Sequence, residues 1–271
     1  MSGMKVNNKI LSHLLSATSR EQFVNGKNQQ QVSSCTLMVN ESVLKTICIV
    51  KDGKTSLSKF STKIDEQEDS IIPVPDIDRL LGVLKFHGDN VSLFYDKAKE
   101  TVMVKSSNKQ TTLLGGFKSK AYENSRDTLE ERQAEALNRA EQIQGNSYVV
   151  KDGSKINPFF IAQIESSILW DALRCDGING QKLNRYRFEL KDGELSVSVG
   201  DHYKGMTESV LCDGYSGDDF VAEFEGGLEN IIKFYSGKVD LNFLDFSEYN
   251  QGTRLILTFS NGDWVFQAGV L

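Results

Sequence analysis

The stretch DIDRLLGVLKFHGDNVSLFYD, from Asp76 to Asp96, contains the pattern of a short amphipathic helix, a tight turn and a strand. Its apolar residues are first spaced i, i+3 and i+4, as on one face of a helix, and then alternate, as on a half-buried strand. A second copy, GGLENIIKFYSGKVDLNFLD, begins at Gly226. A shift of about 148 residues takes Lys85-Phe86 to Lys233-Phe234.

Two copies at this distance are too far apart for a solenoid, whose repeats recur roughly every 20 to 50 residues. They predict two domains of one design, and 271 residues suffice for two domains with a core each. We predict a first domain at 1–115, a connector at 116–154 and a second domain at 155–271. The connector is charged, and its segment 127–143 favours an exposed helix with a thin apolar stripe. We interpret that helix as a spacer that faces solvent or a partner.

The remaining elements follow the same order in both halves. Apolar spacing predicts a helix at 9–24 and another in PFFIAQIESSILWDALRCDG, with Ile161, Ile164, Ile168, Leu169 and Leu173 on its buried face. Hairpin turns are predicted at Lys51-Asp52-Gly53, Lys191-Asp192-Gly193 and Asn261-Gly262. The fold class is therefore α+β, with antiparallel sheets and two short helices per domain.

Composition limits the classes of function. With 39% hydrophobic and 25% charged residues the chain is typical of a soluble globular protein, and no apolar run approaches the roughly 20 residues of a membrane helix. We expect no membrane partner and a cytoplasmic location, that is, the host cytoplasm for a phage protein or the nucleus for a eukaryotic one. Four scattered cysteines predict reduced, packed thiols. A net charge of −6 argues against DNA binding by an overall basic surface, so any DNA contact must use local basic residues.

The usual catalytic signatures are missing from the sequence: it has no GxGxxG, GxxxxGK[ST], GxSxG or HExxH motif. His13, His87 and His202 lack the spacing of metal ligands, and the acidic stretches KIDEQED and GYSGDD are better explained as loops. We therefore predict no enzyme activity, no cofactor and no metal. An enzyme with an unrecognised site stays open as an alternative.

Basic residues on or beside the four helices are the remaining candidates for function. Any one of them alone is ordinarily a solvated side chain, and neighbouring acids dilute the pattern. Their equivalent positions in a repeated unit favour a shared role. The candidates are Lys5, Lys9, Arg20, Arg79, Lys85, Arg174, Lys182, Arg185 and Lys233.

Duplicated domains, a charged connector, an acidic total charge and the absence of catalytic motifs together resemble the DNA sliding clamps. The resemblance is carried by VPDIDRLLGVLKFHGDNVSLFYD, DDFVAEFEGGLENIIKFYSGKVDLNF and the terminal RLILTFSNGDWVFQA, and in outline it covers both domains. It is closest to the two-domain clamps, namely proliferating cell nuclear antigen and the clamps of T4-like bacteriophages. The ending FQAGVL lacks the proline and charged tail of the cellular eukaryotic clamps and indicates a viral or phage version.

The resemblance implies a processivity factor that encircles duplex DNA without reading its sequence. The basic candidates above would face the DNA, and the ring would be a homotrimer, because two-domain clamps close as trimers whereas the longer three-domain bacterial clamps close as dimers. It also implies partners: a DNA polymerase and other replication proteins, and an ATP-dependent clamp loader. Partner peptides would enter a pocket whose C-terminal wall is formed by Phe266, Ala268 and Val270.

Two further interpretations stay open. One is a viral processivity factor of the same domain design that holds DNA without forming a ring. The other is a structural or adaptor protein built from duplicated antiparallel domains.

Overall fold

The computed structural model describes residues 2–18, 22–24, 27–29, 34–50, 56–99, 101–114, 129–176, 178, 185–201 and 205–269. Its contacts divide the chain into two compact units. Unit 1 contains Met1–Ser19, Gln31–Val50 and Leu57–Glu141, and unit 2 contains Gln142–Leu271 with Arg20–Gln30 and Lys51–Ser56. No helix among the described residues has the length and apolar character needed to cross a membrane.

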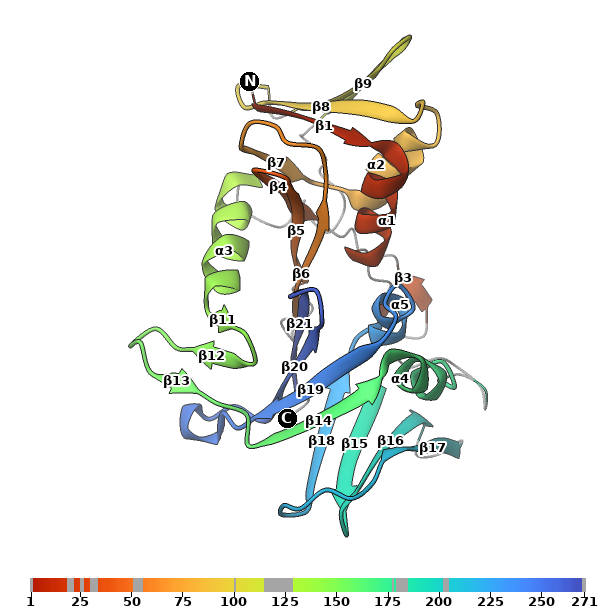
Figure 1. The fold of residues 1–271 in the computed structure, drawn as a ribbon, viewed down its shortest axis with the longest axis vertical. Helices are drawn as coiled ribbons and strands as arrows, with labels where there is room; N and C mark the ends of the chain where they lie inside the picture. The colour runs from red at the N-terminus through yellow and green to blue at the C-terminus, as the bar shows by residue number, and fades with distance from the viewer. Residues whose placement is uncertain are drawn as a thin grey trace. The chain divides into compact units, whose positions relative to one another are not determined.

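Unit 1 contains two runs of four strands (Figure 1). The first has the order β1-β8-β9-β10 and pairs antiparallel throughout. The second has the order β6-β5-β4-β7, in which β4 pairs antiparallel with β5 and β7. The bounds are β1 (Ser2–Asn7), β4 (Cys35–Asn40), β5 (Val43–Val50), β6 (Ser56–Lys63), β7 (Ser70–Val74), β8 (Asn90–Asp96), β9 (Thr101–Ser106) and β10 (Lys109–Leu114).

Unit 2 repeats this order strand for strand. Its runs are β14-β19-β20-β21 and β17-β16-β15-β18, all antiparallel. A shift of 148 residues takes Asn90 to Lys238 and Asp96 to Leu244, the ends of β8 and β19. The bounds are β14 (Phe160–Glu165), β15 (Arg185–Lys191), β16 (Glu194–Asp201), β17 (Gly205–Cys212), β18 (Phe220–Glu225), β19 (Lys238–Leu244), β20 (Arg254–Phe259) and β21 (Trp264–Ala268). The prediction of two domains of one design is confirmed at the level of strand order.

Each unit places two short helices against each other, α1 on α2 and α4 on α5. Their bounds are α1 (Asn8–Thr18), α2 (Ile77–Leu84), α4 (Ser166–Leu173) and α5 (Leu228–Ile232). The Asp76 side chain caps α2 by accepting a hydrogen bond from the Arg79 backbone N–H at 2.9 Å. The Asn8 side chain donates to the carbonyl oxygens of Leu84, His87 and Gly88, so the start of α1 is tied to the end of α2. The predicted α+β class with two short helices per domain is confirmed.

Small elements complete the described chain. Unit 2 holds a three-stranded sheet of β11 (Ile143–Gln144), β12 (Ser147–Val149) and β13 (Lys155–Ile156), and a 3₁₀ turn at Ser247–Tyr249. A separate ribbon pairs β2 (Gln22–Val24) with β3 (Lys27–Gln29).

Two predicted helices are longer than the observed ones, the first at its end and the second at its start. Lys5 lies in strand β1, which the sequence analysis missed, and α1 ends at Thr18 instead of residue 24. In the second half, the first part of the predicted helix is strand β14, because Phe160, Ala162 and Ile164 are buried alternately. Ile161 is therefore exposed, and Ile168 is exposed on α4, whose buried residues include Leu169 and Leu173; both isoleucines were expected in the core.

The hairpin predictions at Lys191-Asp192-Gly193 and Asn261-Gly262 are confirmed by the β15–β16 and β20–β21 pairs. Asp192 and Gly193 both have positive φ, as a two-residue hairpin turn requires. The turn predicted at Lys51-Asp52-Gly53 lies outside the described residues.

Helix α3 (Leu129–Glu141) corresponds to the predicted connector helix, but it is not a spacer in solvent. It packs against β4, β5 and β7 of unit 1, and its Ala136 is only 3% exposed. Thr18 of α1 shares a 2.8 Å hydrogen bond with Thr46 of β5, so the next residue, Ile47, faces away from α1 and is nevertheless buried. The sheet is therefore covered by α1 on one face and by α3 on the other (Figure 1). Helix α3 belongs to unit 1. The domain limits predicted from the sequence, 1–115, 116–154 and 155–271, stay a prediction.

Candidate nucleic-acid and partner interfaces

Three of the helices, α2, α4 and α5, are followed directly by an exposed basic residue. Lys85 caps the C-terminus of α2, Arg174 that of α4 and Lys233 that of α5. A cation is stabilised there by the carbonyl end of the helix, which is a structural reason for these residues. Because they are exposed, they also offer positive charge to an external anion.

Two of these helix-associated basic residues, Arg174 and Lys233, interact with neighbouring side chains. The Arg174 guanidinium lies 3.0 Å from an Asp171 carboxylate oxygen and 4.6 Å from the centre of the Trp170 ring. Lys233 Nζ lies 5.1 Å from the centre of the Phe234 ring. Arg79 is exposed on the first turn of α2. Lys9, on α1, is exposed as predicted.

One acid expected to dilute this positive charge is withdrawn from the surface. Glu229 of α5 is buried and accepts a hydrogen bond from the Tyr186 hydroxyl. Burial raises the pKa of Tyr186, and the Glu229 carboxylate raises it further, so the phenol stays protonated and donates. The carboxylate of Glu229 is thus a structural group of unit 2, and Lys233 is the exposed charge of α5.

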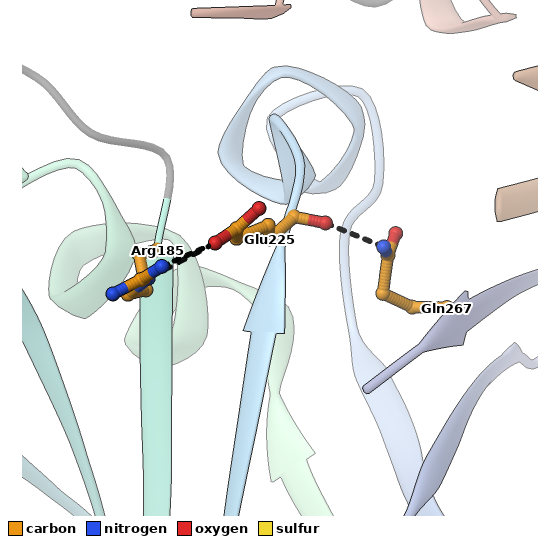
Figure 2. Close-up of polar contacts among 3 residues, drawn as sticks. All are labelled: Arg185, Glu225 and Gln267. Atoms are coloured by element: carbon orange, nitrogen blue, oxygen red, sulfur yellow. Dashed lines mark hydrogen bonds and ion pairs between the residues drawn. The ribbon is translucent and has the colours of Figure 1, made fainter. Parts of the chain in front are cut away.

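Arg185 has a different environment from the other candidates (Figure 2). Its Nε and Nη2 donate to the same Glu225 oxygen, at 3.1 and 2.6 Å, between paired positions of β15 and β18. The backbone carbonyl of Glu225 accepts a hydrogen bond from the Gln267 side chain of β21. Gly226 follows with φ 135°, and a Cβ there would lie 3.2 Å from Gln267 Oε1. Arg185 is therefore half-buried in a contact that joins β15 and β18, and a phosphate would have to compete with Glu225 for it.

The other predicted DNA-facing residues separate into two groups. Lys5 is exposed, but it lies on the edge strand β1, where its backbone exchanges two hydrogen bonds with the Gln67 side chain. Arg20 and Lys182 lie outside the described residues, as does Val270 of the predicted partner pocket.

Phe266 and Ala268, predicted to form one wall of a partner pocket, belong to an aromatic cluster of unit 2. Phe266 and Ala268 lie in β21, and Phe266 is 8% exposed because Tyr148 of β12 packs on it with ring centres 5.4 Å apart. Tyr148 also meets Phe246 edge to face at 5.2 Å, and the Arg254 guanidinium lies 5.7 Å from the centre of the Phe246 ring. Tyr148, Phe246 and Arg254 were not predicted from the sequence. Only Tyr148 had a signal, as an aromatic residue in an apolar run directly after the connector helix.

The described residues contain no group of His, Cys, Asp and Glu side chains that could hold a metal ion. Each acidic stretch is bonded to a hairpin turn of its own unit: Asp69 accepts from the Glu41 backbone N–H of the β4–β5 turn at 2.9 Å, and Asp219 accepts from the Asp192 backbone N–H of the β15–β16 turn at 3.1 Å. His87 is buried, with both ring nitrogens 3.0 Å from hydroxyl groups of Ser106 and Thr111. These contacts explain the groups as parts of the fold.

The sequence matches no family model and no curated protein. The structure is similar over 100% of its length to three bacterial proteins, of which it covers 65 to 66%. They are a DNA polymerase sliding clamp from Pseudomonas aeruginosa (TM-score 0.62, 14% identity), a DNA polymerase III beta chain from Streptococcus pneumoniae (0.63, 14%) and a DNA polymerase III beta subunit from Thermotoga maritima (0.63, 11%). This chain thus spans slightly less than two thirds of their length, and it has the fold of a DNA polymerase sliding clamp.

Proposed function

We propose that this protein is a DNA polymerase sliding clamp, a non-enzymatic processivity factor that encircles duplex DNA as a ring of three identical chains. The carrying observation is the repeated unit: both halves have one strand order and one helix pair, and the whole chain follows the clamp fold. Enclosure keeps a protein of net charge −6 on DNA without tight binding. A weak attraction between helix lysines and phosphates then suffices, because phosphate contacts carry no sequence information.

The number of three chains per ring is inferred from the length of this chain relative to the bacterial clamps. In the clamp family that this chain resembles, the longer three-domain bacterial chains close as dimers. Three copies of a chain that spans about 66% of such a chain supply nearly the same total length as two copies of the longer one. A ring of this kind needs heterologous contacts that close by rotation.

The units offer two strand edges for such a contact. Within the described sheets, β10 ends the first run of unit 1 and β17 ends the second run of unit 2. Exposed strand edges pair readily with another chain. The β10 side carries the exposed Lys105 and Lys109, and β17 carries the exposed Glu208, so antiparallel pairing of β10 with β17 of another copy would bring opposite charges together.

Exposed apolar side chains flank both edges. Phe86 is 73% exposed, and Lys109 Nζ of β10 lies 5.8 Å from the centre of its ring. Val210 of β17 is 54% exposed, and Ile168 of α4, a helix that contacts β17, is 43% exposed. Such residues beside an open edge fit a protein interface better than solvent.

The partners would be duplex DNA, a DNA polymerase and other replication proteins, and an ATP-dependent loader. The DNA-facing residues in this proposal are Lys9, Arg79, Lys85, Arg174 and Lys233, with Lys5, Arg20, Lys182 and Arg185 as further candidates. Partner peptides would dock at the aromatic cluster of Phe266 and Ala268, and Val270 would extend that wall. We further propose a phage or other viral origin, with the protein acting in the host compartment where DNA is replicated.

The first test is the absolute mass in solution, by light scattering on a size-exclusion column over a range of concentrations. The proposal expects about 91 kDa, three times the chain mass of 30.3 kDa. The trimer should then stimulate its polymerase on primed circular DNA and slide off linear DNA with free ends. A chain that stays monomeric at high concentration and binds linear DNA with a steep salt dependence would instead be a processivity factor that forms no ring.

A further inference from the structure

Cys35 and Cys48 face each other across the β4–β5 pair of unit 1. They are register partners at the end of the ladder, Cys35 at the start of β4 and Cys48 near the end of β5. Directly opposed residues on antiparallel strands point to the same face, with Cβ atoms about 4.5 to 5.5 Å apart. A disulfide needs about 3.5 to 4.5 Å between Cβ atoms. A closure of about 1 Å would bring this pair into bonding range.

Neither cysteine forms a disulfide, and both side chains are enclosed. Cys35 is 6% exposed and Cys48 is 1% exposed. Cys48 lies two residues after Thr46 on β5, so it shares the face that Thr46 turns toward α1. Burial raises the pKa of the Cys35 thiol, and the neighbouring Cys48 raises it further. Oxidation of the enclosed pair is therefore expected to be slow, because the thiolate is the reactive form.

The other two cysteines have no such partner opposite them. Cys212 of β17 is paired with Leu195 of β16. The Cys175 thiol donates to the Asp171 carbonyl oxygen at 3.3 Å, in the turn after α4. Both side chains are partly exposed, whereas those of Cys35 and Cys48 are buried.

We propose that Cys35 and Cys48 are a reversible dithiol that a small-molecule disulfide, such as oxidised glutathione, converts to a β4–β5 disulfide. In the first step one thiolate attacks a sulfur of oxidised glutathione, forms a mixed disulfide and releases one glutathione. The second thiolate then attacks the protein sulfur of the mixed disulfide and releases the other glutathione. Two electrons pass from the protein thiols to the small disulfide, and the two thiol protons end on the two released glutathione thiols.

The disulfide would fasten one end of the β4–β5 ladder, whose strands are also contacted by α1 and α3 from opposite faces. A cross-link restricts the unfolded chain and so favours the folded state of unit 1, provided that the closed geometry is not strained. The proposal is independent of the ring and of DNA.

The test uses the full chain with Cys175→Ser and Cys212→Ser, so that only the pair can react. Incubation with oxidised glutathione in native buffer, followed by alkylation and intact-mass measurement, should show a loss of two hydrogen atoms and no alkylated thiol. Peptide mapping should join Cys35 to Cys48, and the urea midpoint should rise and return to its original value with dithiothreitol.

Persistent glutathione adducts, or a disulfide that forms only in urea, would overturn the proposal. A Cys48→Ala variant in the same background is the matched control and should form no internal disulfide. If the serine variants fail to fold, the wild-type chain with peptide mapping gives the same decision, because a Cys35–Cys48 peptide is distinguishable from one that contains Cys175 or Cys212.

Discussion

His87 in unit 1 and Tyr235 in unit 2 occupy equivalent positions of the repeat. Each contacts the last hairpin of its own unit, His87 through hydrogen bonds to hydroxyl groups and Tyr235 through ring stacking and a hydrogen bond to a carboxylate. The shift of 148 residues takes one to the other. His87 is bonded through both ring nitrogens to Ser106 of β9 and Thr111 of β10. Tyr235 stacks on a phenylalanine of β20, with ring centres 3.8 Å apart, and donates its hydroxyl to Asp263 at 2.9 Å, directly before β21. In both units the third residue after the second helix therefore joins the end of that helix to the last two strands.

The histidine makes the stability of unit 1 depend on pH. Burial lowers the pKa of His87, and the charge of Lys109 lowers it further. The unfolded chain, whose histidine titrates near the ordinary value of about 6.5, then binds more protons than the folded chain at lower pH. The stabilising contribution is thus complete above about pH 6.5 and is lost as the pH falls through and below it.

Urea unfolding at a series of pH values checks this. His87→Gln should flatten the decline of the midpoint between about pH 7 and pH 5. His13→Gln, at an exposed position of α1, is the matched control and should keep the wild-type decline. Equal pH profiles for the wild type and His87→Gln would contradict the assignment.

The equivalent residue in unit 2 should contribute through its hydroxyl group. Tyr235→Phe keeps the ring stack and removes one donor to Asp263, whose carboxylate is buried and would keep the Asn261 side-chain donor at 2.8 Å. We expect a loss of about 1 to 3 kcal/mol in the free energy of unfolding. Tyr249→Phe, at an exposed 3.3 Å contact with Ser154, should change it by less than about 0.5 kcal/mol. Chemical denaturation of both variants measures the two losses in the free energy of unfolding, and equal losses would contradict the role assigned to the Tyr235 hydroxyl.

The helices and turns that depend on a local sequence pattern were predicted correctly. The helix that begins after Asp76 has its capping side chain and a clean i, i+3, i+4 stripe, and the Asp192-Gly193 turn has the residues that its positive φ angles require. Strand β14 was mistaken for a helix because Ile161, Ile164 and Ile168 also fit helical spacing, although the buried residues alternate. Period-2 and period-3.6 patterns cannot be separated reliably over so few residues.

The candidate site was less accessible to sequence reasoning, because its contacts join distant segments. Tyr148 reaches Phe266 across more than a hundred residues, and no local pattern encodes that contact. The withdrawal of Glu229 into a hydrogen bond with Tyr186 likewise depends on tertiary packing. The exposed lysines at the ends of α2 and α5, by contrast, were predicted, because the repeat places them equivalently.

Those two lysines should contribute to retention on DNA. In Lys85→Ala/Lys233→Ala, the slope of log affinity against log salt for nicked circular DNA should fall by about 1 per lysine that contacts a phosphate. The mass of the assembly and the urea midpoint should be nearly unchanged, because both side chains are exposed. Lys191→Ala, at the exposed β15–β16 turn, is the control. An equal fall in the control would remove the reason to assign DNA contact to the helices.

The proposed joint between copies should depend on Phe86. Replacing it by aspartate puts a charge at a position that is already exposed in the single chain, so we expect the stability of the monomer to change by less than about 0.5 kcal/mol. Light scattering should show the mass falling from that of the trimer toward that of one chain. Ile71→Asp, an exposed apolar position of β7, should leave the mass unchanged. A Phe86→Asp protein that keeps the trimer mass would exclude this residue from the joint.

Helix α3 provides a matched pair within one element. Ala136 is buried against unit 1 and Ala134 is exposed, so substitution of either by glutamate changes helix propensity equally and differs in burial. Ala136→Glu forces a longer, charged side chain against the sheet and should lower the free energy of unfolding by about 2 to 4 kcal/mol. Ala134→Glu should change it by less than about 0.5 kcal/mol. Equal, small effects in chemical denaturation would mean that α3 stands off the sheet in solution, as a spacer would.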